Sequence, residues 1–170
     1  MKNNKKAVSI MIGYVLLVVG VIVLSAVVYV WLKSYLPRET IECPEGVSLF
    51  IEENVCKEIN GIYELNISIR NNGRFDIDGY YIKSGVSGQE IATEDISENI
   101  TYGGYSPKDT GIVLFSGGKL KTDEKVEHRY SIGEIISLIE IIPIRYEVIE
   151  GKNRLVSCGN KKIRQIIECD

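Results

Sequence analysis

An uninterrupted apolar run near the N-terminus is the strongest pattern in the chain. Residues Ala7 to Leu32 form 26 consecutive positions without a formal charge, with Lys5 and Lys6 before them and Lys33 after them. A bilayer core about 30 Å thick needs about 20 helical residues at about 1.5 Å each. The run therefore predicts a transmembrane helix over residues 7–36. The alternative is a buried helix of a soluble protein, which would normally be shorter and carry a polar face.

A proline ends the predicted helix and opens a connector over residues 37–46. Pro37 disfavours helical geometry at the residue before it, and a polar stretch follows from Arg38 to Glu42. A short basic leader, residues 1–6, precedes the helix. Residues 47–170 remain for an outer domain.

The pattern beyond the connector consists of short β-type runs separated by Gly, Asn, Asp and Ser. The predicted strands are 47–52, 62–71, 77–84, 112–115, 134–142, 144–149, 154–157 and 163–168. Such strands in about 130 residues predict a mainly antiparallel β-sandwich. We expect positive-φ turn residues in Asn71–Gly73 and in Glu150–Asn153, since both contain Gly and Asn.

Two features interrupt this strand pattern. Pro143 cannot donate a ladder hydrogen bond, so it predicts a bulge, a sheet edge or a bend between sheets. Residues 85–107 are poorly patterned and predict a long loop or an irregular insertion, exposed to solvent, with Tyr102 and Tyr105 beside two glycines. This loop is either a binding surface or a mobile tether.

Charge is distributed unevenly along the chain. All 23 acidic residues follow the helix, and four of the 20 basic residues precede residue 38, which leaves 16 basic groups and a net charge of −7 for residues 38–170. Nucleic acid is an unfavourable partner for such a domain, because phosphate binding needs a basic patch. Lys2, Lys5 and Lys6 predict a cytoplasmic N-terminus, which places the C-terminal domain outside the cell. The apolar helix makes membrane lipid an expected partner.

The cysteines agree with an extracellular domain. Cys43, Cys56, Cys158 and Cys169 all follow the helix, and their even number predicts two disulfides. A zinc site is the alternative, but the spacing lacks a C-x-x-C pair. A Cys43–Cys56 bridge is plausible locally, whereas Cys158 and Cys169 lie too far apart along a strand if a turn follows Ser157. The crossed pairings stay open.

Two sequons add a further extracellular signal. Asn66-Ile67-Ser68 and Asn99-Ile100-Thr101 both fit the N-glycosylation pattern. Apolar and polar residues alternate around Asn66, which places this side chain on the solvent face of its strand.

The sequence Lys5-Lys6-Ala7-Val8-Ser9-Ile10-Met11-Ile12-Gly13 resembles the N-terminus of archaeal type IV pilins. In that family a prepilin peptidase cuts on the cytoplasmic side after the basic residue. The resemblance therefore implies a processing site at Lys5, Lys6 and Ala7, with cleavage between Lys6 and Ala7, and other pilin-like subunits as partners. The glutamate that bacterial pilins carry at the fifth mature position is replaced here by Met11, which favours the archaeal type.

Two glycines of the helix fit the same resemblance. Gly13 and Gly20 are seven residues apart and lie on one helix face, where small residues allow neighbouring helices to pack closely. Gly is also frequent in transmembrane helices for other reasons. A weaker likeness, over residues 64–79, is to Ig-like domains of archaeal surface proteins: a strand, an Asn-Gly turn and a returning strand that brings Phe75 and Ile77 onto the core.

Catalytic patterns are missing from the sequence. It contains no glycine-rich phosphate loop, nucleophile elbow or zinc-protease helix, and Gly117–Lys119 is interpreted as a turn. His128 is interpreted as part of a solvated strand edge or turn. Asp76 and Asp78 are interpreted as solvated charges, with a weak Ca²⁺ site as the alternative. We therefore expect no enzyme activity, no metal and no cofactor.

The sequence thus favours a pilin-like subunit of a cell-surface filament, cleaved after Lys6. The first alternative is an uncleaved, membrane-anchored binding module with a ligand near Tyr102 and Tyr105. The second is a minor anchor or stator of a surface filament.

Overall fold

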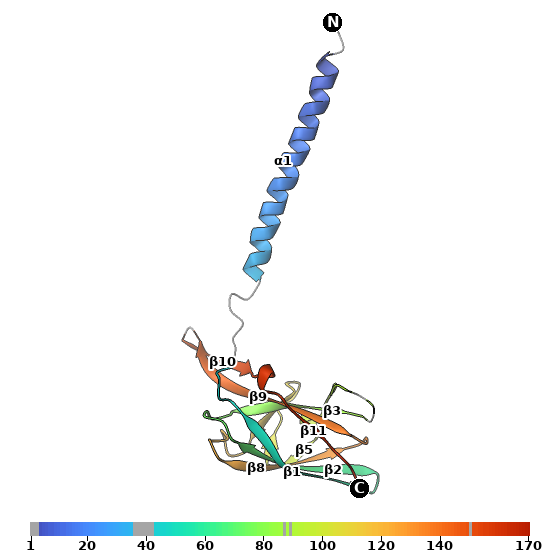
Figure 1. Cartoon of the computed structure of the whole chain (residues 1–170), viewed down its shortest axis with the longest axis vertical. Helices are drawn as coiled ribbons and strands as arrows, with labels where there is room; N and C mark the ends of the chain where they lie inside the picture. The colour runs from blue at the N-terminus through green and yellow to red at the C-terminus, as the bar shows by residue number, and fades with distance from the viewer. Residues whose placement is uncertain (1–3, 36–42, 87, 89, 150) are drawn as a thin grey trace. The chain divides into compact units, whose positions relative to one another are not determined.

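The computed structural model describes residues 4–35, 43–86, 88, 90–149 and 151–170, which form one helix and a separate β-domain (Figure 1). Of the expected connector, residues 37–46, the part from residue 37 to residue 42 lies outside the described residues, as does residue 36. The elements, in chain order, are α1 (Asn4–Tyr35), β1 (Leu49–Ile59), β2 (Ile62–Asn71), β3 (Gly79–Gly85), β4 (Glu94–Asp95), the 3₁₀ turn η1 (Ser97–Asn99), β5 (Ile100–Tyr102), β6 (Gly104–Tyr105), β7 (Ile112–Phe115), β8 (Lys125–Ile132), β9 (Leu138–Ile149), β10 (Lys152–Ser157), η2 (Gly159–Lys161) and β11 (Ile163–Ile166).

The predicted apolar helix is present as α1, which has 32 residues. At about 1.5 Å per residue it is about 48 Å long, more than the thickness of a bilayer core. Its segment Met11–Tyr35 is long and apolar enough to cross a membrane.

The first sheet has four strands in the order β1-β2-β8-β5, and each pair of neighbours is antiparallel. Its β1–β2 hairpin closes through Asn60 and Gly61, both with positive φ, at 56° and 80°. Two such residues form the type I′ turn that fits the twist of a hairpin. The prediction ended β1 at residue 52 and was wrong there, because the strand continues through a register shift between Ile51 and Glu53 to Ile59.

The second sheet has seven strands in the order β10-β9-β3-β7-β6, with β11 beside β9 and β4 beside β3. The two strands predicted on either side of Pro143 are one strand, β9. One side of β9 pairs with β3. The opposite side pairs with β11 from Leu138 to Ile141 and with β10 from Ile144 onward. The Pro143 carbonyl accepts a hydrogen bond from the Cys158 amide. The nitrogen of Pro143 points to the same side of β9, between the ends of β10 and β11. No described strand pairs with that side of β9 at this position, so the missing N–H removes no ladder bond.

The segment 85–107 is not a long exposed loop, so that prediction was wrong, and it is closer to the alternative, an irregular insertion, although part of it is buried. It contains β4 on the seven-stranded sheet, then η1, then β5 on the four-stranded sheet, then β6 back on the seven-stranded sheet. Ala92, Ile96 and Ser97 are buried, so this segment closes one side of the core. The Asn71–Gly73 segment also differs from the expected hairpin, because β2 and β3 belong to different sheets, and Gly73 is not among the glycines with positive φ.

The two sheets pack face to face and share one core, which confirms the predicted antiparallel β-sandwich. In Figure 1 the layer of β1, β2 and β8 lies against the layer of β3, β9 and β10. Leu65, Ile67 and Ile69 of β2 enclose the core from one side, and Ile82 and Ile141 enclose it from the other. Alternating side chains of each strand point inward, as in other sandwiches.

Candidate functional site

The apolar surface of α1 is the first candidate site. Every residue from Met11 to Tyr35 is exposed, and no face of the helix is polar. An added Cβ at Gly13 or at Gly20 would meet open space. Seven residues correspond to nearly two turns, so both glycines lie on one face and leave a shallow, smooth strip there. Such a surface requires lipid or other apolar helices around it.

The residues of the expected processing site lie at the start of the same helix. Lys5, Lys6 and Ala7 belong to the first two turns of α1, which begins at Asn4. The first four amides of a helix lack intrahelical partners, so this end opens more easily than the middle. A peptidase that needs an extended substrate would unwind only these turns.

A second candidate lies on the outer face of the four-stranded sheet, around the first sequon. Val55, Asn66, Arg129 and Tyr102 are cross-strand neighbours in one row over β1, β2, β8 and β5. The Asn66 Oδ1 accepts a bond from the Arg129 Nε at 2.9 Å, and the Arg129 guanidinium lies 5.9 Å from the Tyr102 ring centre. Asn66 is exposed, as predicted.

This row borders a depression of about 150 Å³. Pockets for small molecules usually enclose about 300–1,000 Å³, so the depression is too small for most metabolites. Tyr105, which the sequence grouped with Tyr102, lies on the seven-stranded sheet instead. The two tyrosines therefore do not form one binding surface.

The second sequon residue has a structural role. The Asn99 Nδ2, the atom that would carry a glycan, donates to the Ser131 carbonyl at 2.9 Å. The Thr101 hydroxyl donates to the Arg129 carbonyl at 3.1 Å. Both bonds connect the segment around β5 to β8, and a glycan on Asn99 would break the first of them.

A polar cluster is buried between the sheets, and the sequence reasoning missed it. His128 is 1% exposed, so the interpretation as a solvated edge residue was wrong. The Tyr80 hydroxyl contacts the His128 Nδ1 and lies 2.5 Å from the Tyr130 hydroxyl. Burial lowers the pKa of His128 to about 4, partly offset by the backbone of Gly103, and burial raises the pKa of Tyr80 and of Tyr130. The imidazole is therefore neutral at pH 7.

The strand β8 explains why His128 is buried. In Lys125–Ile132 the inward positions are Val126, His128, Tyr130 and Ile132, and charged or polar side chains occupy the positions between them. The sequence signal for this burial was the alternation of apolar and polar residues, in which His128 stands at a position where an apolar residue is expected. The cluster is buried and belongs to the core, since Phe115 also packs on the Tyr80 and His128 rings.

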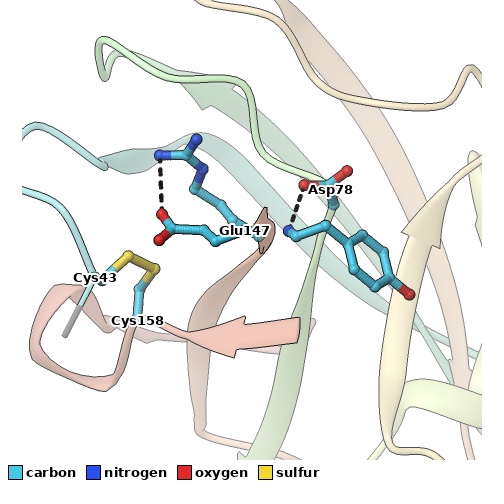
Figure 2. The surroundings of a disulfide bond; sticks show 6 residues. Cys43, Asp78, Glu147 and Cys158 are labelled. Atoms are coloured by element: carbon cyan, nitrogen blue, oxygen red, sulfur yellow. Dashed lines mark hydrogen bonds and ion pairs between the residues drawn. A yellow bond between two sulfur atoms is a disulfide. The ribbon is translucent and has the colours of Figure 1, made fainter. Parts of the chain in front are cut away.

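Asp76 and Asp78 have different environments, so they do not form a joint cation site. Asp76 is exposed, whereas Asp78 is 8% exposed and its interpretation as a solvated charge was wrong. The Asp78 carboxylate accepts a bond from the Tyr146 amide at 2.8 Å and pairs with the Lys119 ammonium at 3.2 Å. It holds β9 next to the first residue of β3, and Figure 2 shows the bond that Asp78 accepts.

Two disulfides cross-link the domain, and their pairing is one of the crossed alternatives. Cys43 bonds to Cys158, and Cys56 bonds to Cys169. The local Cys43–Cys56 bridge does not form, because Cys56 lies seven residues into β1, about 23 Å along the strand from its start. Figure 2 shows the Cys43–Cys158 bridge beside the ion pair between Arg145 and Glu147, whose nitrogen and oxygen are 3.8 Å apart.

Compared with known proteins, the chain matches no family model, no curated protein and no solved structure.

Proposed function

We propose that this chain is a pilin-like structural subunit of a cell-surface type IV filament. It is made as a membrane precursor with its N-terminus in the cytoplasm, a prepilin peptidase cleaves it after Lys6, and the β-sandwich faces outward. The observation that supports this most is the basic pair Lys5-Lys6 at the start of a helix that is apolar on all faces. The disulfide-linked β-domain that follows fits an oxidising, extracellular location.

The electrostatics of the N-terminus give the cleavage a physical purpose. Lys2, Lys5 and Lys6 hold the precursor in the bilayer, because a lysine at the bilayer centre costs about 2.5–3.5 kcal/mol on insertion scales. Cleavage removes these three charges, and the new ammonium group at Ala7 replaces the one that Met1 carried. The barrier to pulling the helix out of the membrane falls by about 7–10 kcal/mol, the equivalent of three lysines.

The helix can then exchange lipid for neighbouring helices. Its exposed Val, Leu and Ile side chains pack as well against apolar helices as against lipid chains. The strip at Gly13 and Gly20 is the face where two helices approach most closely. Partners of this helix are therefore lipid first and other pilin-like subunits afterwards.

The second candidate function is an uncleaved, membrane-anchored binding module. The observation in its favour is the depression beside Tyr102, which combines a ring with the Arg129 guanidinium and the Asn66 amide. Its small volume favours a single sugar unit or a short side chain as the ligand. In this function the leader stays attached and the helix remains in lipid.

Mass spectrometry of the mature N-terminus in the native host separates the two functions. Filament subunits should begin at Ala7, and replacing the basic pair by Lys5→Ala with Lys6→Ala should leave the leader attached. Lys2→Ala is the matched control, since it removes one leader charge away from the cut and should be processed normally. If the wild-type surface pool retains residues 1–6, the pilin proposal is wrong and the anchored module replaces it.

A further inference from the structure

The outer face of the seven-stranded sheet is apolar, although a two-layer sandwich normally has polar residues there. Cross-strand pairs share a face, and Tyr105, Leu114, Tyr81, Ile142, Tyr146 and Leu155 occupy outward positions on five neighbouring strands. The inward positions on the same strands are Val113, Tyr80 and Ile141, which are fully buried. We call this surface, from β6 to β10, the apolar face.

The outer face of the four-stranded sheet is different. Its middle strands carry Glu64, Asn66, Arg70, Glu127 and Arg129 outward, with an exposed Val55 on the edge strand. This is the alternation of a sheet that faces water on one side. The apolar face is therefore a property of one sheet and not of the whole domain.

The apolar side chains leave large rings and branches accessible to a partner. Tyr105 is 54% exposed, Tyr146 is 48% exposed and Val148 is 72% exposed. Between them the Leu114 and Ile144 side chains close over Gly79, where an added Cβ would come within 3.3 Å of Ile144. Ile144 is itself fully buried, so the accessible apolar surface is formed by the outward side chains around it. Exposed apolar side chains gathered on one sheet face mark an interaction site.

One row of charges borders the apolar face. Asp95 on β4, Lys83 on β3, Glu140 on β9 and Arg164 on β11 are successive cross-strand neighbours, so their charges read minus, plus, minus, plus across the sheet. Within its own chain Glu140 also pairs with Lys162 at 3.1 Å, through one carboxylate oxygen, Oε2. A two-fold axis parallel to the strands, between β3 and β9, turns the row end for end. Asp95 then faces Arg164 of a second copy, and Lys83 faces Glu140 of that copy.

The alternative two-fold axis, perpendicular to the strands and running along this row, would place every charge of the row against its own kind. The row is therefore complementary to itself in one orientation and repulsive in the other. Self-complementarity under a two-fold rotation is the requirement for an isologous dimer.

We propose that the apolar face binds a second copy of this chain, face to face, about a two-fold axis parallel to the strands. In this dimer Tyr81 of each copy packs on Ile142 of the other, and the charge row closes one side of the contact. The contact lies entirely on the β-domain, so it goes beyond the proposed filament function and does not depend on cleavage after Lys6.

The first experiment measures association of the full chain in non-ionic detergent micelles by analytical ultracentrifugation. Leu114→Glu and Tyr146→Glu should each weaken the dimer by about tenfold or more, because each buries a charge in the contact. Val55→Glu, on the outer face of the other sheet, is the matched control and should leave the dimer unchanged, and tyrosine near-UV circular dichroism checks that each variant is folded. A monomeric wild type, or equal effects of Leu114→Glu and Val55→Glu, would overturn the proposal.

The second experiment uses charge reversal to test the row. Lys83→Glu chains should associate poorly with themselves, and so should Glu140→Lys chains, because each places like charges across the contact. A mixture of the two variants should recover the dimer, since the carboxylate introduced in one variant then faces the ammonium group introduced in the other. Recovery requires chain-to-chain contact, which separates it from an effect within one sheet. A mixture that associates no better than either variant alone would overturn the pairing of Lys83 with Glu140.

Salt tests the orientation of the axis. In the proposed arrangement the facing charges of the row attract, whereas the net negative charges of the two domains repel, and salt screens both. As sodium chloride rises from 50 to 500 mM, chosen to span about one decade, the wild-type dimer should therefore lose more affinity than a Lys83→Ala dimer loses. A wild type that loses no more affinity than Lys83→Ala would overturn the orientation. Because α1 itself enters lipid, the apolar face is tested in vesicles by comparing variants. A monomeric wild type, together with a tyrosine fluorescence that changes on vesicle binding in Val55→Glu but not in Leu114→Glu, would identify lipid as the partner of the apolar face and overturn the dimer.

Discussion

Acidification from pH 7 to pH 5 should destabilise the β-sandwich through His128, the only histidine in the chain. Burial holds the pKa of this imidazole at about 4 in the folded state, against 6.5 in the unfolded chain. The unfolded state therefore binds the proton more tightly. The stability linked to His128 is fully present above pH 6.5 and is lost as the pH falls toward 4.

The magnitude follows from the difference of about 2.5 pKa units. At about 1.36 kcal/mol per unit, complete titration would remove about 3.4 kcal/mol of unfolding free energy. Between pH 7 and pH 5 the linkage relation gives a loss of about 2 kcal/mol. That is a large fraction of the 5–15 kcal/mol that is typical of a domain, by order of magnitude.

Urea unfolding of the full chain in detergent micelles at pH 7, 6 and 5 measures this loss, with tyrosine near-UV circular dichroism as the signal. The control is His128→Gln, which removes the titrating ring but keeps a hydrogen-bonding group for Tyr80. Its unfolding free energy should be lower at pH 7 and should change less with pH, because only carboxylates and the terminal amine still titrate. Parallel pH profiles for the wild type and His128→Gln would refute the reasoning.

Two further predictions concern the stability of the same domain. Replacing Cys56 and Cys169 by alanine should lower the unfolding free energy by about 2–5 kcal/mol, because this bridge closes a loop with a sequence separation of 113 residues; unchanged urea unfolding of the double variant would contradict it. Gly103→Ala should destabilise the domain by about 3 kcal/mol or more, because φ is +87° and the added Cβ would overlap the Glu127 carbonyl and the His128 ring. Gly88→Ala is its control, since that glycine also has positive φ but has open space around it.

Helices and strands could be predicted well where the pattern of apolar and polar residues is long and keeps one period. The helix α1 follows from 26 uncharged residues, and β2 follows from the alternation around Asn66. Both depend only on neighbours along the chain and on whether the surroundings are apolar or wet. The class of fold follows from the number and spacing of such runs.

The predictions were wrong where two signals in the sequence conflict, or where the same local signal has different outcomes in the fold. The charges of Lys125, Glu127 and Arg129 concealed the inward alternation of β8, and this also misplaced His128. The Asn60-Gly61 pair closes the β1–β2 hairpin, whereas the same dipeptide at Asn72-Gly73, which predicted a hairpin, does not form one. Pro143 was taken to separate two strands, because the sequence does not tell which side of a strand lacks a neighbour.

The sequence by itself determined the apolar helix, the basic leader, the acidic balance of the domain and the strand periodicity. Each of these depends only on the composition and spacing of residues that are close together in the chain. Only the tertiary structure decided the disulfide pairing, the Tyr80–His128–Tyr130 cluster and the apolar face, because each joins positions about 50 to 115 residues apart or depends on the order of strands in a sheet. Two strands can have the same alternation of inward and outward residues. Whether their outward side chains face water or the proposed partner depends on which of the two sheets each strand joins. That choice is made by the packing of the whole sandwich.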